Sequence, residues 1–316
     1  SGNNAGNATV NLSGGGGITT TGVFAHGIVA QSIAGGGGIS TVNTDTVQMG
    51  GGTAGIAGVA SVTALAPVAT SGIGASAIVA QSIGGGGGLA IGTGAVTFAN
   101  TPSGSNASQV TVTTSGGGAV QTQGATSFGI LAQSIGGGGG AIFGPTSLLS
   151  TNLGTGIGYG GNIGIDAGAN VITSGTGSVA ILGQSIGGGG GVIASTTANA
   201  GFVNYGTGLN SAGNGNLNAG TVAVTTRNQT IATSGVNAAA VVGQSVGAGG
   251  VYFTQANTVS QGTINVSGYL GTVSAGGNGG ANVADAIKVT LGAGGVTTID
   301  TSGANAFGAV AQSVGG

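Results

Sequence analysis

Six glutamines recur in one sequence context, and their type and spacing suggest a shared chemical role. They are separated by 50, 52, 51, 60 and 68 residues, and a serine follows each one. A side-chain amide both donates and accepts hydrogen bonds, so stacked amides can bond to one another in a row. A buried amide without a partner costs about 1–3 kcal/mol, so we expect an inward-facing structural ladder that bonds to itself or to nearby glycine backbone. A row exposed to a ligand is the alternative. The set is Gln31, Gln81, Gln133, Gln184, Gln244 and Gln312.

A threonine precedes each of these glutamines by eleven residues. A regular row of outward hydroxyl groups would be a possible surface ladder, able to bind a carbohydrate or ice. The alternative is an ordinary solvent-exposed strand face, because threonine favours strands. The set is Thr20, Thr70, Thr122, Thr173, Thr233 and Thr301.

Residues suited to catalysis are scarce. The chain has one histidine, His26, and no cysteine or glutamate. Paired-carboxylate, thiolate and histidine-based chemistry therefore lack most of their candidates. Residues 160–166 are similar to a calcium-binding nonapeptide, but that pattern occurs once where a calcium roll needs tandem copies. We therefore predict no enzymatic activity, no cofactor and no metal site, and we expect solvated turn positions for Asp45, Asp166, Asp285 and Asp300.

Composition restricts both the partners and the fold. The formal net charge is −2 with only two basic residues, which excludes a basic surface for nucleic acid. The apolar runs are too short to span a membrane. Glycine supplies 78 of 316 residues, yet 40% of the chain is hydrophobic and only 2% is charged. Such a chain must bury its peptide and apolar groups in regular structure, because it lacks the charge that keeps disordered segments dissolved.

The elements that position these residues follow from an internal repeat. Sixteen consecutive positions, 18–33 in the first copy, align six times without a gap. Val29, Gln31 and Ile33 share one face of a strand with a period of two. A further short strand precedes each threonine strand, as at 110–112. These patterns predict an all-β parallel β-solenoid of six roughly 50–68-residue repeats with glycine-rich corners, forming one domain over 1–316.

The number of coils in each repeat follows from its two halves. The aligned half provides three short strands, and the half beginning with a glycine block, such as 84–88, is expected to form a second, looser coil with the length insertions. Twelve coils of about 4.8 Å would give a rod of about 60 Å. Polyproline-II helices built from the glycine blocks are the alternative architecture.

One segment carries a resemblance to a known family. Residues 27–38 read Gly-Ile-Val-Ala-Gln-Ser-Ile-Ala-Gly-Gly-Gly-Gly, and 80–88 read Ala-Gln-Ser-Ile followed by five glycines. These repeats resemble the passenger regions of glycine-rich, adhesin-like proteobacterial autotransporters of the type V secretion pathway. The resemblance covers all six repeats. It implies a secreted β-solenoid, located outside the cell or on the bacterial outer surface.

These observations lead to an expected role. We expect a structural repeat protein that forms a rod or extracellular filament, with an adhesive or biofilm-matrix function. The expected partners are further coils, from identical copies stacked end to end or from a longer chain, together with host or matrix glycans. The alternative function is a carbohydrate- or ice-binding module that uses the threonine ladder. A solenoid enzyme is disfavoured because four scattered aspartates do not build a catalytic cleft.

Overall fold

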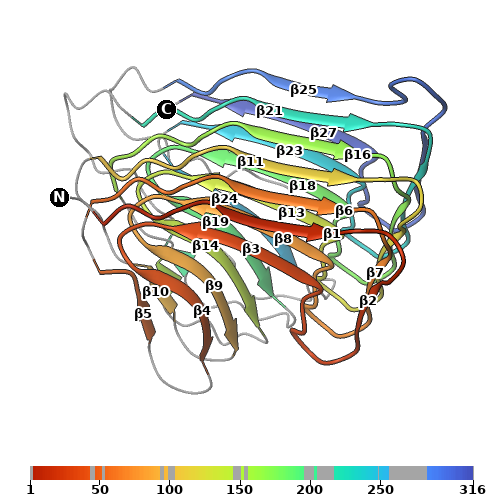
Figure 1. The fold of residues 1–316 in the computed structure, drawn as a ribbon, viewed down its shortest axis with the longest axis horizontal. Helices are drawn as coiled ribbons and strands as arrows, with labels where there is room; N and C mark the ends of the chain where they lie inside the picture. The colour runs from red at the N-terminus through yellow and green to blue at the C-terminus, as the bar shows by residue number, and fades with distance from the viewer. Residues whose placement is uncertain are drawn as a thin grey trace.

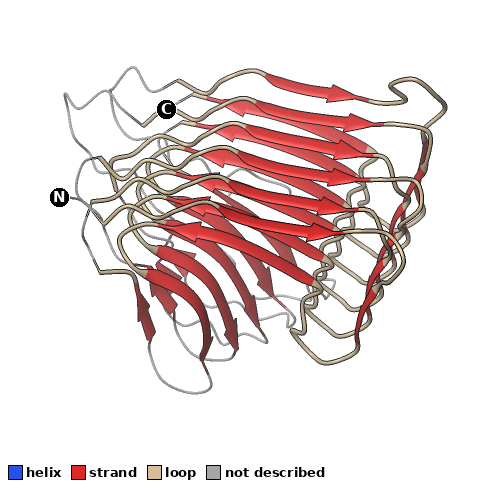
Figure 2. Ribbon diagram, in the orientation of Figure 1, coloured by secondary structure: helices blue, strands red, loops and turns tan. Residues whose placement is uncertain are grey.

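The structure is a computed structural model that describes residues 3–42, 47–51, 54–92, 96–98, 104–144, 151–152, 156–195, 203–204, 217–247, 249–255 and 283–315. Within these residues it contains parallel β-sheets and no helix, which confirms the predicted β-solenoid (Figure 2). In this part of the chain, no helix has the length and apolar character needed to cross a bilayer.

Sheets A and B, each with six strands, form two adjoining sides of the solenoid (Figure 1). Sheet A contains β1 Ala8–Leu12, β6 Ala60–Ala64, β11 Val110–Thr114, β16 Ile163–Ala167, β21 Val222–Thr226 and β25 Ile287–Thr290. Sheet B contains β2 Ile18–Thr20, β7 Val68–Thr70, β12 Val120–Thr122, β17 Val171–Thr173, β22 Thr230–Thr233 and β26 Thr298–Thr301.

The remaining strands form three further sheets. Sheet C contains β3 Ile28–Ile33, β8 Ile78–Ile83, β13 Ile130–Ile135, β18 Ile181–Ile186, β23 Val241–Val246 and β27 Ala309–Val314. Sheet D contains β4 Gly37–Val42, β9 Gly87–Gly92, β14 Gly139–Gly144, β19 Gly190–Ser195 and β24 Gly250–Gln255. Sheet E contains β5 Val47–Met49, β10 Val96–Phe98, β15 Thr151–Asn152 and β20 Val203–Asn204.

Each repeat forms one coil of the solenoid. Val62 of β6 pairs with Val10 of the preceding repeat and with Val112 of the following one. The expectation of two coils per repeat is therefore wrong, because the glycine-block half adds sheets D and E to the same coil. Five spacings of about 4.8 Å give the six coils an axial length of about 24 Å. The longer loops expected in the repeats of 60 and 68 residues involve 205–216 and 256–282, which lie outside the described residues.

Sheet C is the central layer, and both of its faces are buried in coils 2–5. On one face, Ile130 and Ala132 belong to the hydrophobic core shared with sheets A and B. On the other face, Leu131 packs in a second core with Phe143 of sheet D. A parallel strand covered on both faces needs apolar residues at nearly every position, which explains the repeated Ile-Val-Ala-Gln-Ser-Ile sequence.

The turn between sheets B and C has the same conformation in all six coils. In each coil, the second residue after the repeated glycine has a left-handed backbone conformation, with φ between 53° and 69°. These residues are Phe24, Gly74, Thr126, Gly177, Asn237 and Asn305. The repeated glycine itself is needed for close coil stacking. A Cβ atom on Gly124 would lie 1.9 Å from the carbonyl oxygen of Gly72. No side chain fits there, so glycine keeps this corner compact.

Candidate functional site

The six glutamines form a continuous side-chain ladder along sheet C. They are in register across all six coils, and those of coils 2–5 are almost fully buried. Each Nε2 donates to the Oε1 of the next coil. The donor–acceptor distances are 2.6 Å for Gln31–Gln81, 2.6 Å for Gln81–Gln133, 2.9 Å for Gln133–Gln184, 3.1 Å for Gln184–Gln244 and 3.1 Å for Gln244–Gln312. The ladder satisfies buried amides without any charge.

The serine after each glutamine forms a second ladder on the opposite face of sheet C, a role that the sequence analysis did not assign. The Oγ atom of Ser134 donates to the carbonyl oxygen of Ser108 at 2.8 Å and accepts from the amide of Gly161 at 2.7 Å. Equivalent donor–acceptor pairs involve Ser32, Ser82, Ser185 and Ser245. Each of these five serines therefore joins sheet C to the segments that lead into sheet A in two successive coils.

The threonine row does not form the expected surface ladder. Thr70, Thr122, Thr173 and Thr233 are at most 3% exposed, and Thr20 and Thr301 of the end coils are half-buried. Each of these threonines is the last residue of a sheet B strand. The repeated Ile or Val two positions earlier faces the core, and the threonine lies on the same face of the strand. Thr173 Oγ1 donates to the carbonyl of Ser178 at 2.7 Å, and Thr122 bonds in the same way to Ser127 at 3.0 Å. The hydroxyls therefore stabilise the turn into sheet C and are not accessible to a ligand.

The outer face of sheet A carries regularly placed, accessible hydroxyl groups in coils 1–3. In coils 1–3, two columns of polar side chains occupy the outward positions, and each column is in register from strand to strand. All six side chains are half-buried or exposed. Thr111 Oγ1 donates to Ser61 Oγ at 3.0 Å, so neighbouring hydroxyls in one column contact each other. The columns are Thr9, Ser61 and Thr111, and Asn11, Thr63 and Thr113.

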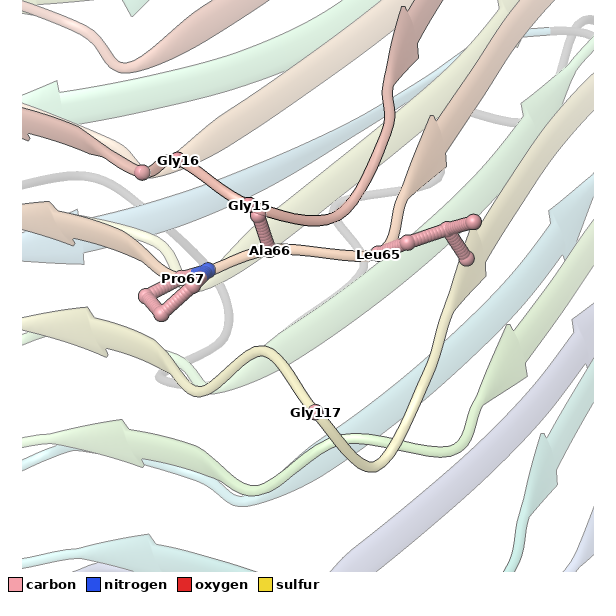
Figure 3. A pocket seen from close by; sticks show the side chains of 7 residues that line it. Gly15, Gly16, Leu65, Ala66, Pro67 and Gly117 are labelled. Atoms are coloured by element: carbon pink, nitrogen blue, oxygen red, sulfur yellow. The ribbon is translucent and has the colours of Figure 1, made fainter.

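A shallow hollow adjoins these columns at the corner between sheets A and B. Its volume is about 310 Å³, and Figure 3 shows Leu65 and Pro67 of coil 2 between the glycine-rich corners of coils 1 and 3. Leu65 directly follows β6 and is 41% exposed. Gly16 borders the hollow, and a Cβ atom added there would have no neighbour within 4 Å. Coils 1–3 therefore combine a hydroxyl face with an exposed apolar contact.

No protein-family model matches this sequence, and comparison with curated proteins and with solved structures gives no match either.

The sequence analysis missed the sheet A face although a signal for it was present. The alternation Val-Thr-Val-Thr in β11 indicates a strand with one polar and one buried face. The equivalent strands read Thr-Val-Asn in coil 1 and Ser-Val-Thr in coil 2. The outward positions are therefore polar in all three coils but are not occupied by the same residue. A search for an identical residue in every repeat therefore selects the buried threonines instead.

The face changes character in coils 4–6. Arg227 and Asp166 form a two-pronged ion pair between coils 4 and 5, with N–O distances of 2.6 and 2.8 Å. The hydrogen bond to Asp166, and then its charge, raise the pKa of Arg227. Lys288 occupies an outward position of coil 6. Charged side chains therefore lie on or directly beside the sheet A face in coils 4–6, whereas the outward columns of coils 1–3 have none.

The aspartates are not all turn residues. Asp166 lies in β16 and Asp300 in β26, so the prediction of turn positions is wrong for these two; their side chains point outward between inward residues. Asp285 lies before β25, and Asp45 falls outside the described residues. Among the described residues, no group of three or more His, Cys, Asp or Glu side chains is arranged to hold a metal ion.

Two titratable side chains lie beside aromatic rings, His26 half-buried and Tyr252 fully buried. The Nδ1 atom of His26 accepts a 3.1 Å hydrogen bond from the amide of Ser76, and its ring lies edge-on to Phe143 at 5.0 Å. Burial lowers the pKa of His26 to about 4, while the bond from Ser76 acts in the opposite direction. Burial raises the pKa of Tyr252, whose ring packs edge-on to Phe128. Both side chains are therefore neutral at pH 7 and pack against aromatic rings of the second core.

Proposed function

We propose that this chain is a structural segment of a secreted or cell-surface solenoid that forms a rod or extracellular filament with an adhesive or matrix-forming role. The observation that carries this proposal is the identical bonding of successive coils. Every coil presents the same glutamine and serine groups to its neighbours, so a further coil along the axis can be joined by the same hydrogen bonds. Repetition of this kind suits a protein that acts through its length and surface.

The end coils support axial continuation. Gln31 in coil 1 uses its Nε2 on Gln81, and Gln312 in coil 6 uses its Oε1 to accept from Gln244. Within the described residues, the ladder therefore has an amide oxygen at one end and an amide nitrogen at the other. Both end glutamines are only half-buried. We propose that the next coil along the axis comes from a second copy of the chain or from a longer chain.

The chemical inventory supports a non-catalytic role outside the cell. The polar side chains buried along the axis are amides and hydroxyls, whose repeated bonds are structural. The repeated Ala-Gln-Ser-Ile and glycine-block sequence resembles autotransporter passengers, which are exported to the cell surface. We therefore propose an extracellular or outer-surface location, with copies of the same coil and matrix glycans as partners.

Electron microscopy and fibre diffraction of the purified chain test this proposal. We expect end-to-end particles longer than the roughly 24 Å of one copy, and a reflection near 4.8 Å along the particle axis. A chain that remains monomeric at millimolar concentration, with no axial 4.8 Å repeat on drying, would rule out assembly of separate copies and leave only continuation within a longer chain. Absence of the β-sheet signal in circular dichroism would remove the structural basis of the proposal.

A further inference from the structure

We propose that the outer face of sheet A in coils 1–3, together with the adjoining hollow at Leu65, binds a neutral β-linked polysaccharide. This inference rests on the adhesive part of the proposed function and assigns it a site and a class of ligand. It replaces the threonine row of sheet B, which is buried, with a different set of side chains. The site lies on the side of the solenoid, so its use does not depend on what the end coils contact.

The two columns, which contain five hydroxyl side chains and Asn11, provide the polar contacts. A threonine or serine hydroxyl both donates and accepts hydrogen bonds, as a sugar hydroxyl does, so each can pair with the other in either direction. Coil 2 presents Ser61 and Thr63 two residues apart on one strand, hence about 6.6 Å apart at their Cα atoms. Along the axis the same positions recur every 4.8 Å or so. The result is a flat grid of donors and acceptors.

The axial spacing indicates how the ligand lies. Successive rings in an extended β-linked chain follow one another at a distance close to that between coils. A chain that runs along the solenoid axis can therefore place one ring over each coil and meet equivalent side chains at every ring. Such repeated weak contacts act together, because each further contact forms within an existing complex.

The hollow provides the apolar contact that a sugar also requires. Sugar rings have C–H faces that pack against apolar side chains. Leu65 is 41% exposed beside the hydroxyl columns, and Pro67 lines the same hollow. The volume of about 310 Å³ is at the lower end of the range for small-ligand sites, enough for about one ring or ring substituent. This hollow favours a carbohydrate over ice, because an ice surface needs only the flat grid.

The absence of formal charge on these side chains points to a neutral ligand. The six column residues, Leu65 and Pro67 are all uncharged. The charged residues of the described sheet A face, Asp166 and Lys288 among them, lie in coils 4–6. An anionic polysaccharide would need basic groups beside the hydroxyls. We therefore expect selection for neutral over acidic chains.

Co-sedimentation with cellulose and chitin, with alginate as the anionic comparison, tests the inference. Thr63→Lys places a charge in the centre of the grid, and Gly16→Phe fills the hollow at a position with open space and no left-handed φ. We expect each variant to weaken binding to the neutral polysaccharide about tenfold, as loss of one or two hydrogen bonds or an apolar contact would do. Thr225→Lys makes the same change in the same column of coil 5 and should leave binding unchanged.

The outcomes separate this inference from the proposed function. Binding to neutral polysaccharide that falls in Thr63→Lys and Gly16→Phe but not in Thr225→Lys supports the site. No binding by the unchanged protein, stronger binding to alginate, or equal effects of both lysine variants overturns it. Growth inhibition of ice crystals without polysaccharide binding also overturns it. Electron microscopy of the same samples shows whether axial assembly persists, so either proposal can fail alone. Unchanged circular dichroism and melting temperature exclude misfolding of the variants.

Discussion

The side-chain nitrogen of Gln81 donates a 2.6 Å hydrogen bond to the side-chain oxygen of Gln133, although 52 residues separate them. Gln133 in turn donates to Gln184, so the same amide is both donor and acceptor. Gln133 has no measurable exposure to solvent. Its contribution to stability therefore depends on keeping both functions of the amide.

We predict that Gln133→Glu destabilises the protein by more than about 3 kcal/mol at pH 7, because it buries a charge and removes the donor to Gln184. Stability should recover partly at low pH, where the protonated carboxyl group can donate again. Gln31→Glu is the matched control in the half-buried end coil, and its effect should be smaller. Urea unfolding at two pH values measures both; an unchanged midpoint for Gln133→Glu would contradict a buried ladder.

A glycine pair tests the close stacking of coils. Gly124→Ala should destabilise by several kcal/mol, because its Cβ atom would lie 1.9 Å from the backbone oxygen of Gly72 and the two coils would have to separate. Gly116→Ala should change stability by less than about 1 kcal/mol, because its nearest contact is an ordinary 3.5 Å. Thermal unfolding of the two variants measures the difference. Equal melting temperatures would show that the corner can expand.

Threonines on the two sheets should respond differently to loss of the hydroxyl. Thr122→Val removes a buried donor to the carbonyl of Ser127 and should cost about 1–2 kcal/mol. Thr113→Val on the exposed face of sheet A should change stability by no more than about 0.5 kcal/mol. Chemical denaturation of the two variants checks this order. The reverse order would contradict the burial of Thr122 and the exposure of Thr113.

The stability of coil 1 should decrease as the pH is lowered, because of His26. Its pKa in the folded protein is about 4, below the ordinary value of 6.5, so the unfolded chain binds a proton first as the pH falls. Stability is therefore complete above pH 6.5 and is lost progressively down to about pH 4, by about 3 kcal/mol in total.

Hydrogen exchange of the coil 1 amides between pH 7 and pH 4, corrected for the intrinsic rate, measures this change. His26→Phe is the matched variant, because coil 3 has Phe128 at the equivalent position of the repeat. The variant should show no loss of protection between pH 6.5 and pH 4.5. A His26 pKa near 6.5 by NMR titration would contradict burial of the neutral ring.

Much of the fold could be predicted because the repeat encodes its own register. Parallel strands from successive repeats pair residue for residue, so an ungapped alignment of the six copies is also a list of strand partners. Gln81 aligns with Gln133 in the sequence and pairs with it in sheet C. The repeated glycine at the corner between sheets B and C behaves in the same regular way. In coils 2–6 an added Cβ atom would lie 1.8–2.0 Å from the carbonyl oxygen of the equivalent glycine in the preceding coil.

The sequence by itself determined the solenoid, the in-register stacking and the alternation within each strand. The tertiary structure decided which faces are covered, because a period of two separates the faces of a strand without showing what packs on each. Thr122 therefore proved buried and Thr113 exposed, although both are threonines in short strands. It also decided that each repeat is one wide coil, because only the pairing of β9 with β14 shows that the glycine-block half stacks on its own equivalent one repeat away.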